Sequence, residues 1–202
     1  FPMTKMEKYL QKVGDEIWFT EVDRSNLKID YRIKDVIYSE TSPLQHIMIL
    51  DSYDFGPMLV LDGAVQTTAL EGFIYNEMIT HIPLNIHPNP KNVLIIGGGD
   101  CGVAREVAKY PNIQRIDMVE IDEMVVSACK NHLKDVSGNL SDPRVNFIFK
   151  DGTSYVKGKR EYLYDVIIVD SSDPVGPAVK LFELEFYQDL YNNLHEDGLM
   201  VC

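Results

Sequence analysis

The chain has 202 residues, a length that suits one domain of ordinary size with a small appendage. Its residues are 45% hydrophobic and 25% charged, and no apolar run approaches the roughly 18 residues that cross a bilayer, so we expect a soluble globular protein with no signal peptide and no membrane partner. The formal net charge of −12 argues against a nucleic-acid partner, because phosphate binding needs a basic face, and it would suit a cationic ligand.

The first 70 residues are predicted to form a small antiparallel β domain, because their segments are rich in β-branched and aromatic residues. Residues 1–3, "FPM", are interpreted as a remnant of cloning. A hairpin turn is expected at "SYDFG" (52–56). The expected strands are "EIWFTEV" (16–22), "LKIDYRIKDVIYSET" (27–41), "HIMILDS" (46–52) and "PMLVLDGAVQTT" (57–68).

A helix is predicted at the start of the second unit, residues 71–202. The segment "EGFIYNEMITHIPL" (71–84) carries apolar residues at near-helical spacing. Pro83 should end or bend this helix, because proline lacks the amide hydrogen that a helix interior uses.

Apolar strands then alternate with amphipathic helices, which predicts an α/β fold. Runs this continuously apolar belong to a mostly parallel sheet that is covered on both faces. Right-handed crossovers make it a doubly wound, Rossmann-like sheet of the methyltransferase type. The expected strands are "NVLIIGG" (92–98), "RIDMVEI" (115–121), "VNFIFKD" (145–151), "YDVIIVD" (164–170) and "GLMVC" (198–202), with helices over 101–109 and 122–133.

The sequence stops inside the predicted fifth strand, at Cys202. We therefore expect that the C-terminal part of the sheet is missing and that the chain is a fragment of a longer protein. Such a truncation would leave an uncovered sheet edge and would weaken turnover and dimerisation.

A glycine-rich loop, "GGGDCG" (97–102), lies between a predicted strand and a predicted helix. Gly97, Gly99 and Gly102 follow the G-x-G-x-x-G spacing that lets a backbone turn tightly and approach a ligand. Glu120 ends the next strand, where a carboxylate can accept hydrogen bonds from two ribose hydroxyls. Together these features predict nucleoside binding, and the alternative is that the glycines serve only strand–helix packing.

The charge of Asp100 bears on which nucleoside binds. A dinucleotide would place its pyrophosphate at the helix N-terminus, where Asp100 would repel it. S-adenosylmethionine would place an ammonium and a carboxylate there. Asp100 best suits an ammonium without a neighbouring carboxylate, and a nicotinamide-dependent dehydrogenase is a distant alternative.

Two aspartates, Asp170 and Asp173, lie in "VDSSDPVGP" (169–177), directly after an apolar strand. Asp170 would point into the crevice at the carboxyl ends of the strands, where open α/β sheets bind ligands. Without that strand, the pair would be interpreted as a solvated turn or a helix cap.

The three cysteines, Cys101, Cys129 and Cys202, show no CxxC spacing and no partnering histidines. We therefore predict no metal site and no disulfide framework, which favours a reducing, cytoplasmic location.

The motifs together resemble the spermidine synthase (polyamine aminopropyltransferase) family. The matching segments are "LDGAVQTT", "FIYNEMITHIPL", "LIIGGGDCGVAREV", "MVEID", "DPRVNFIFKDG" and "YDVIIVDSSDPVGP". This resemblance implies aminopropyl transfer from decarboxylated S-adenosylmethionine, a co-substrate, to putrescine, giving spermidine and methylthioadenosine with no prosthetic group. It also implies a homodimer or homotetramer.

The resemblance assigns roles to individual positions. Asp170 is the expected proton acceptor of the reaction. The expected nucleoside contacts are Gln45, Gly97, Gly99, Asp100, Glu120, Asp151, Gly152 and Pro177. The expected polyamine contacts are Gln66, Tyr75, Asn76, Asp100, Asp170 and Asp173, although Tyr75 is also compatible with a core aromatic.

Two positions depart from the family pattern. Asn76 stands where the family generally has His or Gln, and Cys101 replaces a common loop glycine. We expect Cys101 to fit only with a negative φ. A polyamine N-methyltransferase and a non-catalytic polyamine or nucleoside binder are the remaining alternatives, and the preferred amine acceptor is left open.

Overall fold

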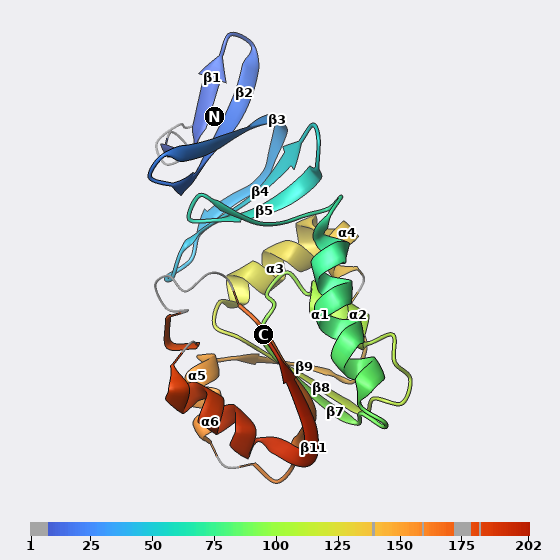
Figure 1. Cartoon of the computed structure of the whole chain (residues 1–202). Helices are drawn as coiled ribbons and strands as arrows, with labels where there is room; N and C mark the ends of the chain where they lie inside the picture. The colour runs from blue at the N-terminus through green and yellow to red at the C-terminus, as the bar shows by residue number, and fades with distance from the viewer. Residues whose placement is uncertain (1–7, 139, 159, 172–178, 182) are drawn as a thin grey trace.

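The computed structural model describes residues 8–138, 140–158, 160–171, 179–181 and 183–202. Two of the predicted site residues, Asp173 and Pro177, lie outside these ranges. The described chain forms an antiparallel sheet followed by a layered α/β unit (Figure 1).

The antiparallel sheet has six strands in sequence order. The predicted strands 27–41 and 46–52 are confirmed, whereas the segment 57–68 is a hairpin of two strands and not one strand. Asp62 and Gly63, both with positive φ, turn the chain there. The strands are β1 (Leu10–Val13), β2 (Glu16–Arg24), β3 (Leu27–Thr41), β4 (His46–Ser52), β5 (Gly56–Leu61) and β6 (Ala64–Thr68).

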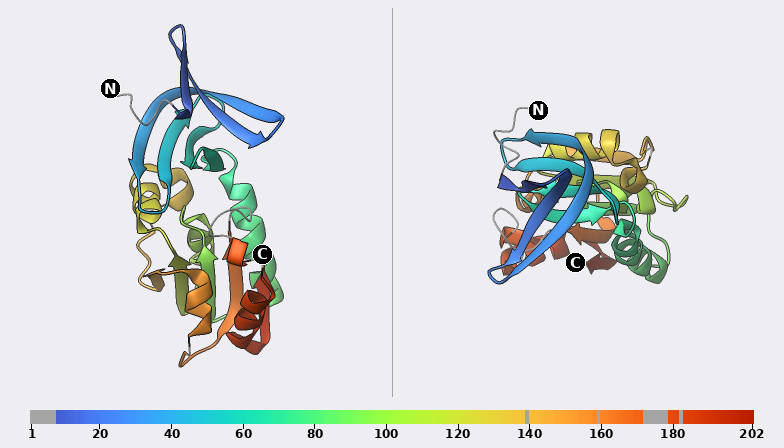
Figure 2. Two further views of the ribbon diagram at one scale, coloured as in Figure 1. Left: turned by 90° about the vertical axis from the view of Figure 1, so that its left-hand side faces the viewer. Right: turned by 90° about the horizontal axis from the view of Figure 1, so that it is seen from above.

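The antiparallel sheet curls (Figure 2). Apolar residues are buried on both of its faces. On one face, Phe19 and Ile33 pack against alternate residues of β4 and β5. Strand β2 approaches β6, where Glu21 Oε1 accepts a hydrogen bond from the Val65 amide at 2.8 Å. This curvature positions carboxylates of β2 beside the second half of the molecule.

Helix α1 (Gly72–Ile86) joins the two parts of the fold. Of the two effects predicted for Pro83, ending the helix is wrong, because the helix continues to Ile86 with Pro83 buried inside it, and bending stays a prediction. The residues whose spacing predicted the helix are mostly on its outer side: Phe73, Ile74, Met78 and Ile82 are each at least half exposed. The side of α1 that faces the protein instead carries polar Asn76 and Thr80 beside Ile79.

The second sheet has five parallel strands in the order β11-β10-β7-β8-β9. This topology confirms the doubly wound, Rossmann-like prediction. The strands are β7 (Asn92–Gly97), β8 (Arg115–Glu120), β9 (Val145–Phe149), β10 (Tyr164–Asp170) and β11 (Leu194–Val201). The helices are α2 (Gly102–Val107), α3 (Glu123–His132), α4 (Lys134–Ser137), α5 (Gly152–Lys157) and α6 (Leu184–Asn192).

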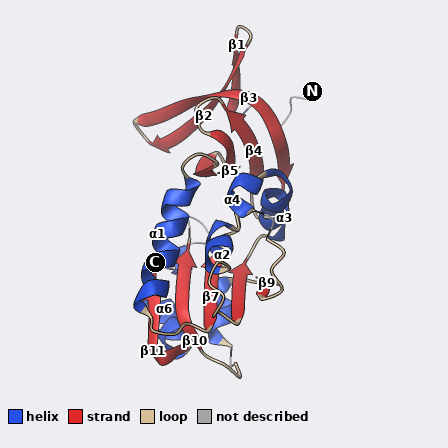
Figure 3. Cartoon of the chain, turned by 90° about the vertical axis from the view of Figure 1, so that its right-hand side faces the viewer, coloured by secondary structure: helices blue, strands red, loops and turns tan. Residues whose placement is uncertain are grey.

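Helices cover both faces of the parallel sheet (Figure 3). Alternate strand residues point to opposite faces. In β7, Val93 and Ile95 pack with α1, α2 and α3, while Leu94 and Ile96 pack with α5 and α6. Burial on both sides explains why these strands are continuously apolar in sequence.

The order of strands reverses direction between β7 and β10, which are neighbours in the sheet although β8 and β9 come between them in sequence. Open α/β sheets bind ligands outside the carboxyl ends of the strands at such a switch point. The last pair of residues between β7 and β10 is Gly97 opposite Asp170. The fold therefore brings the glycine-rich loop and the predicted catalytic aspartate together.

Candidate active site

A cavity of about 980 Å³ lies between the antiparallel sheet and the carboxyl ends of β7, β8 and β10. It is lined by every predicted site residue within the described ranges: Gln45, Gln66, Tyr75, Asn76, Gly97, Gly99, Asp100, Glu120, Asp151, Gly152 and Asp170. These residues come from both sheets, from α1 and from the loops that follow the parallel strands.

The glycine-rich loop and the end of β10 approach more closely than larger residues would allow. Gly97 and Gly98 have φ of +82° and +73°. A Cβ at Gly97 would collide with the Asp170 carbonyl oxygen, and one at Gly98 would lie 3.0 Å from Asp170 Oδ2. The Gly98 amide donates to the Asp170 carbonyl at 3.0 Å. The glycines therefore allow the Asp170 carboxyl group to lie directly above the loop.

Asp100 and Asp170 are paired acids at the floor of the cavity. Burial raises the pKa of Asp170 to about 8, with a further contribution from the charge of Asp100 and an opposing hydrogen bond from Tyr75. Burial also raises the pKa of Asp100, although the Gly102 amide, which donates to Asp100 Oδ1 at 2.7 Å, opposes the change. Two nearby carboxylates that cannot both ionise easily form a site for a positive charge.

Tyr75 and Asn76, neighbours on α1, lie above these acids. Burial and then the Asp170 carboxylate raise the pKa of Tyr75, so its hydroxyl remains a hydrogen-bond donor. Asn76 is 4% exposed, and a Cβ at Gly102 would collide with its amide nitrogen. A glycine at position 102 is therefore needed for Asn76 to reach the cavity.

Glu120 lies at the carboxyl end of β8, beside Gly99. A Cβ at Gly99 would lie 3.0 Å from Glu120 Oε2. Burial raises the pKa of Glu120 to about 7, while a hydrogen bond from the Asp122 amide opposes the rise. This carboxylate, at the end of the second strand of the unit, has the position of a ribose-binding acid in the Rossmann fold.

Asp151 caps helix α5. Its Oδ1 accepts hydrogen bonds from Thr153 N at 2.7 Å, Thr153 Oγ1 at 2.6 Å and Ser154 N at 3.2 Å. Burial would raise the pKa of Asp151, but these hydrogen bonds outweigh it and lower the pKa. A Cβ at Gly152 would lie 2.6 Å from Ile96, so glycine lets α5 start close to β7. Capping occupies one carboxylate oxygen and leaves Oδ2 for a ligand.

The antiparallel sheet supplies the outer part of the cavity. Gln66 is exposed, and its amide donates to the Ala64 carbonyl at 3.1 Å.

The described lining of the cavity is acidic. Carboxylates line it at eight positions, and no lysine, arginine or histidine of the described residues does so. The eight are Glu21, Asp23, Asp62, Glu71, Asp100, Glu120, Asp151 and Asp170. This charge distribution favours a cationic ligand.

Sequence reasoning missed Asp122 and Ser42, which hold the predicted nucleoside contact Gln45. Asp122 is 4% exposed, and its Oδ2 accepts from Gln45 Nε2 at 2.9 Å and from Ser42 Oγ at 2.6 Å. An aspartate directly before an amphipathic helix signals an N-cap. That signal was present in the sequence, but the contact with Ser42, 80 residues earlier, was not.

The expectation for Cys101 is wrong. Its φ is +67°, in the left-handed region, and its side chain is fully buried. Burial and then the charge of Asp100 raise the pKa of the thiol to about 12. The turn from β7 into α2 imposes this conformation, and the residue accepts it because the thiol packs in the core between the sheet and α2.

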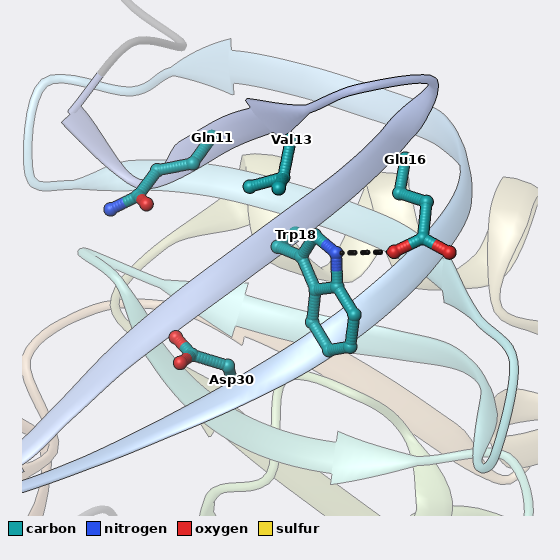
Figure 4. Close-up of a pocket in the computed structure, with 5 residues that line it drawn as sticks. All are labelled: Gln11, Val13, Glu16, Trp18 and Asp30. Atoms are coloured by element: carbon teal, nitrogen blue, oxygen red, sulfur yellow. Dashed lines mark hydrogen bonds between the residues drawn. The ribbon is translucent and has the colours of Figure 1, made fainter.

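A second depression, of about 330 Å³, lies on the outer face of β1, β2 and β3 (Figure 4). Its acids are already partnered: Glu16 accepts from Trp18 Nε1 at 3.0 Å and pairs with Arg32 at 3.0 Å, and Asp30 accepts from Thr20 at 2.6 Å. It is far from the carboxyl ends of the parallel strands, so it is not the candidate site.

The described ranges contain no group of three or more His, Cys, Asp or Glu side chains able to hold a metal ion. In the same part of the chain, no helix is long and apolar enough to cross a membrane.

The fold and the cavity define a Rossmann-like protein with an acidic cavity at the carboxyl ends of its parallel strands. Two family models match the chain: the spermine/spermidine synthase domain over residues 72–202 and the spermidine synthase tetramerisation domain over residues 17–69. The chain belongs to the spermine/spermidine synthase family.

Curated relatives agree with this assignment. The polyamine aminopropyltransferase of Methanocaldococcus jannaschii is 51% identical over 92% of this chain and 63% of its own length. That of Desulforudis audaxviator is 46% identical over 92% of this chain and 67% of its own length. The chain thus spans about two thirds of the length of these relatives.

Solved structures show the same architecture. A spermidine synthase in complex with the transition state analogue AdoDATO superposes with a TM-score of 0.88 at 40% identity, covering 95% of this chain and 65% of that one. Spermidine synthase from Thermotoga maritima gives a TM-score of 0.82 at 38% identity, covering 95% and 64%.

Proposed function

We propose that this chain carries the substrate site of an aminopropyltransferase, which transfers the aminopropyl group of decarboxylated S-adenosylmethionine to putrescine. The observation that carries the proposal is the Asp100–Asp170 pair, at the floor of a cavity whose described lining has eight carboxylates and no basic side chain. The names of the relatives, and the transition state analogue bound to the similar spermidine synthase, support the same activity.

The proposed division of the cavity follows the fold. Glu120 accepts hydrogen bonds from the ribose, and Asp151 Oδ2 accepts from the adenine amino group. Asp100 binds the ammonium of the transferred group. Tyr75, Asn76 and Gln66 face the amine acceptor, together with Asp173, which lies outside the described residues. A ligand with an added carboxylate beside Asp100 would be repelled, which disfavours S-adenosylmethionine.

The proposed chemistry needs a base and correct alignment. The acceptor nitrogen forms a bond to the carbon next to the sulfonium, the carbon–sulfur bond breaks, and the electron pair leaves with sulfur as a neutral thioether. Asp170 takes the proton of the attacking ammonium. Transfer from an alkylammonium of pKa about 10.4 costs about 9 kcal/mol to an ordinary aspartate. The raised pKa of Asp170, about 8, reduces this cost to about 3 kcal/mol.

Turnover tests the proposal directly. The chain is incubated with decarboxylated S-adenosylmethionine and putrescine, and methylthioadenosine and spermidine are measured by chromatography. We expect equal amounts of both products. Asp170→Asn should lower kcat by about 10²–10⁴-fold. Asp54→Asn, in an exposed hairpin turn, is the matched control and should leave kcat unchanged.

Three results would contradict the proposal in different ways. Binding of the nucleoside without product from putrescine, cadaverine, agmatine or spermidine would favour a non-catalytic binder. Greater thermal stabilisation by S-adenosylmethionine than by its decarboxylated form would favour a polyamine N-methyltransferase. Stabilisation by a nicotinamide dinucleotide alone would favour a dehydrogenase.

Self-association and a cytoplasmic location are further parts of the proposal. The match of residues 17–69 to a tetramerisation domain supports a homodimer or homotetramer. Light scattering coupled to size exclusion measures this mass, and a monomer at micromolar concentration would contradict it.

A further inference from the structure

Asp122 connects the two parts of the fold at the edge of the cavity. Its Oδ1 accepts from the Met124 amide at 3.1 Å and caps α3. Its Oδ2 accepts from Ser42 and Gln45, which lie in the loop between β3 and β4. Its own amide donates to Glu120 Oε1 at 3.1 Å. One buried residue thus contacts both the predicted ribose acid and a predicted nucleoside contact.

The chemistry of a carboxylate fixes the orientation of the Gln45 amide. An ionised carboxylate only accepts hydrogen bonds, so the atom of Gln45 that faces Asp122 must be the amide nitrogen. Gln45 lines the cavity, and its amide oxygen has no hydrogen-bond partner among the described residues. The atom left for a ligand is therefore an acceptor.

We propose that Asp122 is a positioning residue, which holds the Gln45 amide with its oxygen available to the bound nucleoside. The inference rests on the proposed function for the identity of the nucleoside. An oxygen suits a positive sulfonium or a hydroxyl that donates, whereas the amide nitrogen of a reversed Gln45 would face a sulfonium with partial positive charge and could not accept from a hydroxyl. Asp122 thereby contributes to selectivity without touching the ligand.

The substitution Asp122→Asn reverses this orientation while it keeps the helix cap. Asparagine caps helices as well as aspartate does, so its oxygen should stay on the Met124 amide. Its nitrogen would then replace Oδ2 and face the Gln45 nitrogen, which is a clash of two donors. Gln45 is expected to reverse and to present its nitrogen to the cavity.

The reciprocal substitution provides a rescue. Gln45→Glu alone places two carboxylates 2.9 Å apart and should weaken binding. In the double variant Asp122→Asn/Gln45→Glu, the introduced asparagine nitrogen donates to one oxygen of the introduced glutamate, and the other oxygen faces the cavity. The net charge of the pair is the same as in the wild type, and an acceptor is again available.

Calorimetric titration with decarboxylated S-adenosylmethionine measures the effect. Each single substitution should weaken binding by about 10-fold or more, as for the loss of a hydrogen bond to a charged group. The double variant should return to within about threefold of the wild type. Glu123→Gln is the matched control, because it removes one carboxylate charge from the exposed first turn of α3 without touching Gln45, and it should change the affinity less than either single substitution.

A measurement without ligand keeps the two proposals separate. The NMR signals of the Gln45 side-chain NH₂ group are assigned by their loss in Gln45→Ala. In the wild type these signals should be shifted from those of a free glutamine and protected from solvent exchange. In Asp122→Asn both the shift and the protection should be lost. An unshifted, unprotected Gln45 NH₂ signal in the wild type would overturn the positioning role of Asp122. A double variant that binds no better than the single variants would also overturn it. If the wild type shows a shifted and protected Gln45 NH₂ signal but binds no nucleoside, the proposed function alone would be overturned.

Discussion

Asp170 is an acid whose charged form is unfavourable in the unliganded protein. An aspartate with a raised pKa in the folded state contributes stability below its unfolded pKa, near 4, and loses that contribution as the pH rises through the folded value of about 8. The stability of Asp170→Asn does not fall in this way, because asparagine does not titrate. We expect this variant to be more stable than the wild type by a few kcal/mol near pH 8.5, and the difference to shrink toward pH 5.

Urea denaturation without ligand at several pH values measures this difference. Asp54→Asn serves as the control for a general charge effect, because Asp54 is exposed in a turn. A stability difference for Asp170→Asn that does not change between about pH 5 and about pH 8.5 would show that the carboxyl group is not perturbed.

Cys101 is a second residue in an unfavourable state, because its backbone adopts a left-handed conformation that favours glycine. A non-glycine residue in the left-handed region costs roughly 1–2 kcal/mol. Cys101→Ala keeps the Cβ and hence this cost, whereas Cys101→Gly removes it. We expect Cys101→Gly to be more stable than Cys101→Ala by about 1 kcal/mol, although it removes one more atom from the core. Equal thermal midpoints for the two variants would argue against the positive φ.

At the residue scale, the sequence predicted positions better than conformations. Asp100, Glu120 and Asp170 could be placed because each lies at or just beyond the carboxyl end of a strand of recognisable pattern, and the structure brings all three to one cavity. The φ of Cys101 and the contacts of Asp122 could not be predicted, because both depend on how the loops meet in space.

At the scale of elements, the ladder between β7 and β10 depends on Gly97. The φ of Gly97 is +82°, and a Cβ there would collide with the Asp170 carbonyl oxygen. Gly97→Ala should therefore destabilise the protein by more than about 2 kcal/mol in urea denaturation. Gly158→Ala is the matched control, since Gly158 has φ of −72° and a Cβ there would have ordinary contacts, so its effect should stay within about 0.5 kcal/mol.

Most strands were predicted from the sequence, whereas strand β1 and helices α4, α5 and α6 were not assigned, and some boundaries differ. The segment 57–68 reads as one strand because Asp62 and Gly63 are its only turn signal, yet they form a hairpin. Pro83 lies in the last turn of α1, where the helix tolerates it and continues to Ile86. Tertiary packing of Pro83 and Leu84, both buried, outweighs the local preference.

At the scale of the whole molecule, one apolar cluster joins the antiparallel sheet to two helices of the α/β unit. Ile47, Ile49 and Leu59 of the antiparallel sheet pack against α3 and α4, including Val125 and Val136. Because this surface is shared, we expect both parts to unfold together. Ile49→Ala should cost about 2–5 kcal/mol, and the tryptophan fluorescence of Trp18 and the far-ultraviolet circular dichroism should still lose structure at one urea concentration. Two separate transitions in the wild type would contradict this.

Chain topology was predictable at this scale because alternating strands and helices allow few arrangements. The closeness of the antiparallel sheet to the glycine-rich loop was not predictable, since it depends on the curl of that sheet and on contacts such as that between Ser42 and Asp122.

The acidic lining of the cavity has a consequence for the later steps of the proposed reaction. Each substrate enters with two positive charges, whereas the thioether product leaves neutral and the triamine product carries three. Eight carboxylates and no basic side chain in the described lining should retain that triamine more strongly than the diamine it replaces. Departure of the triamine would then limit the cycle. Added spermidine should inhibit turnover, and this inhibition should weaken as salt shortens the range of the attraction.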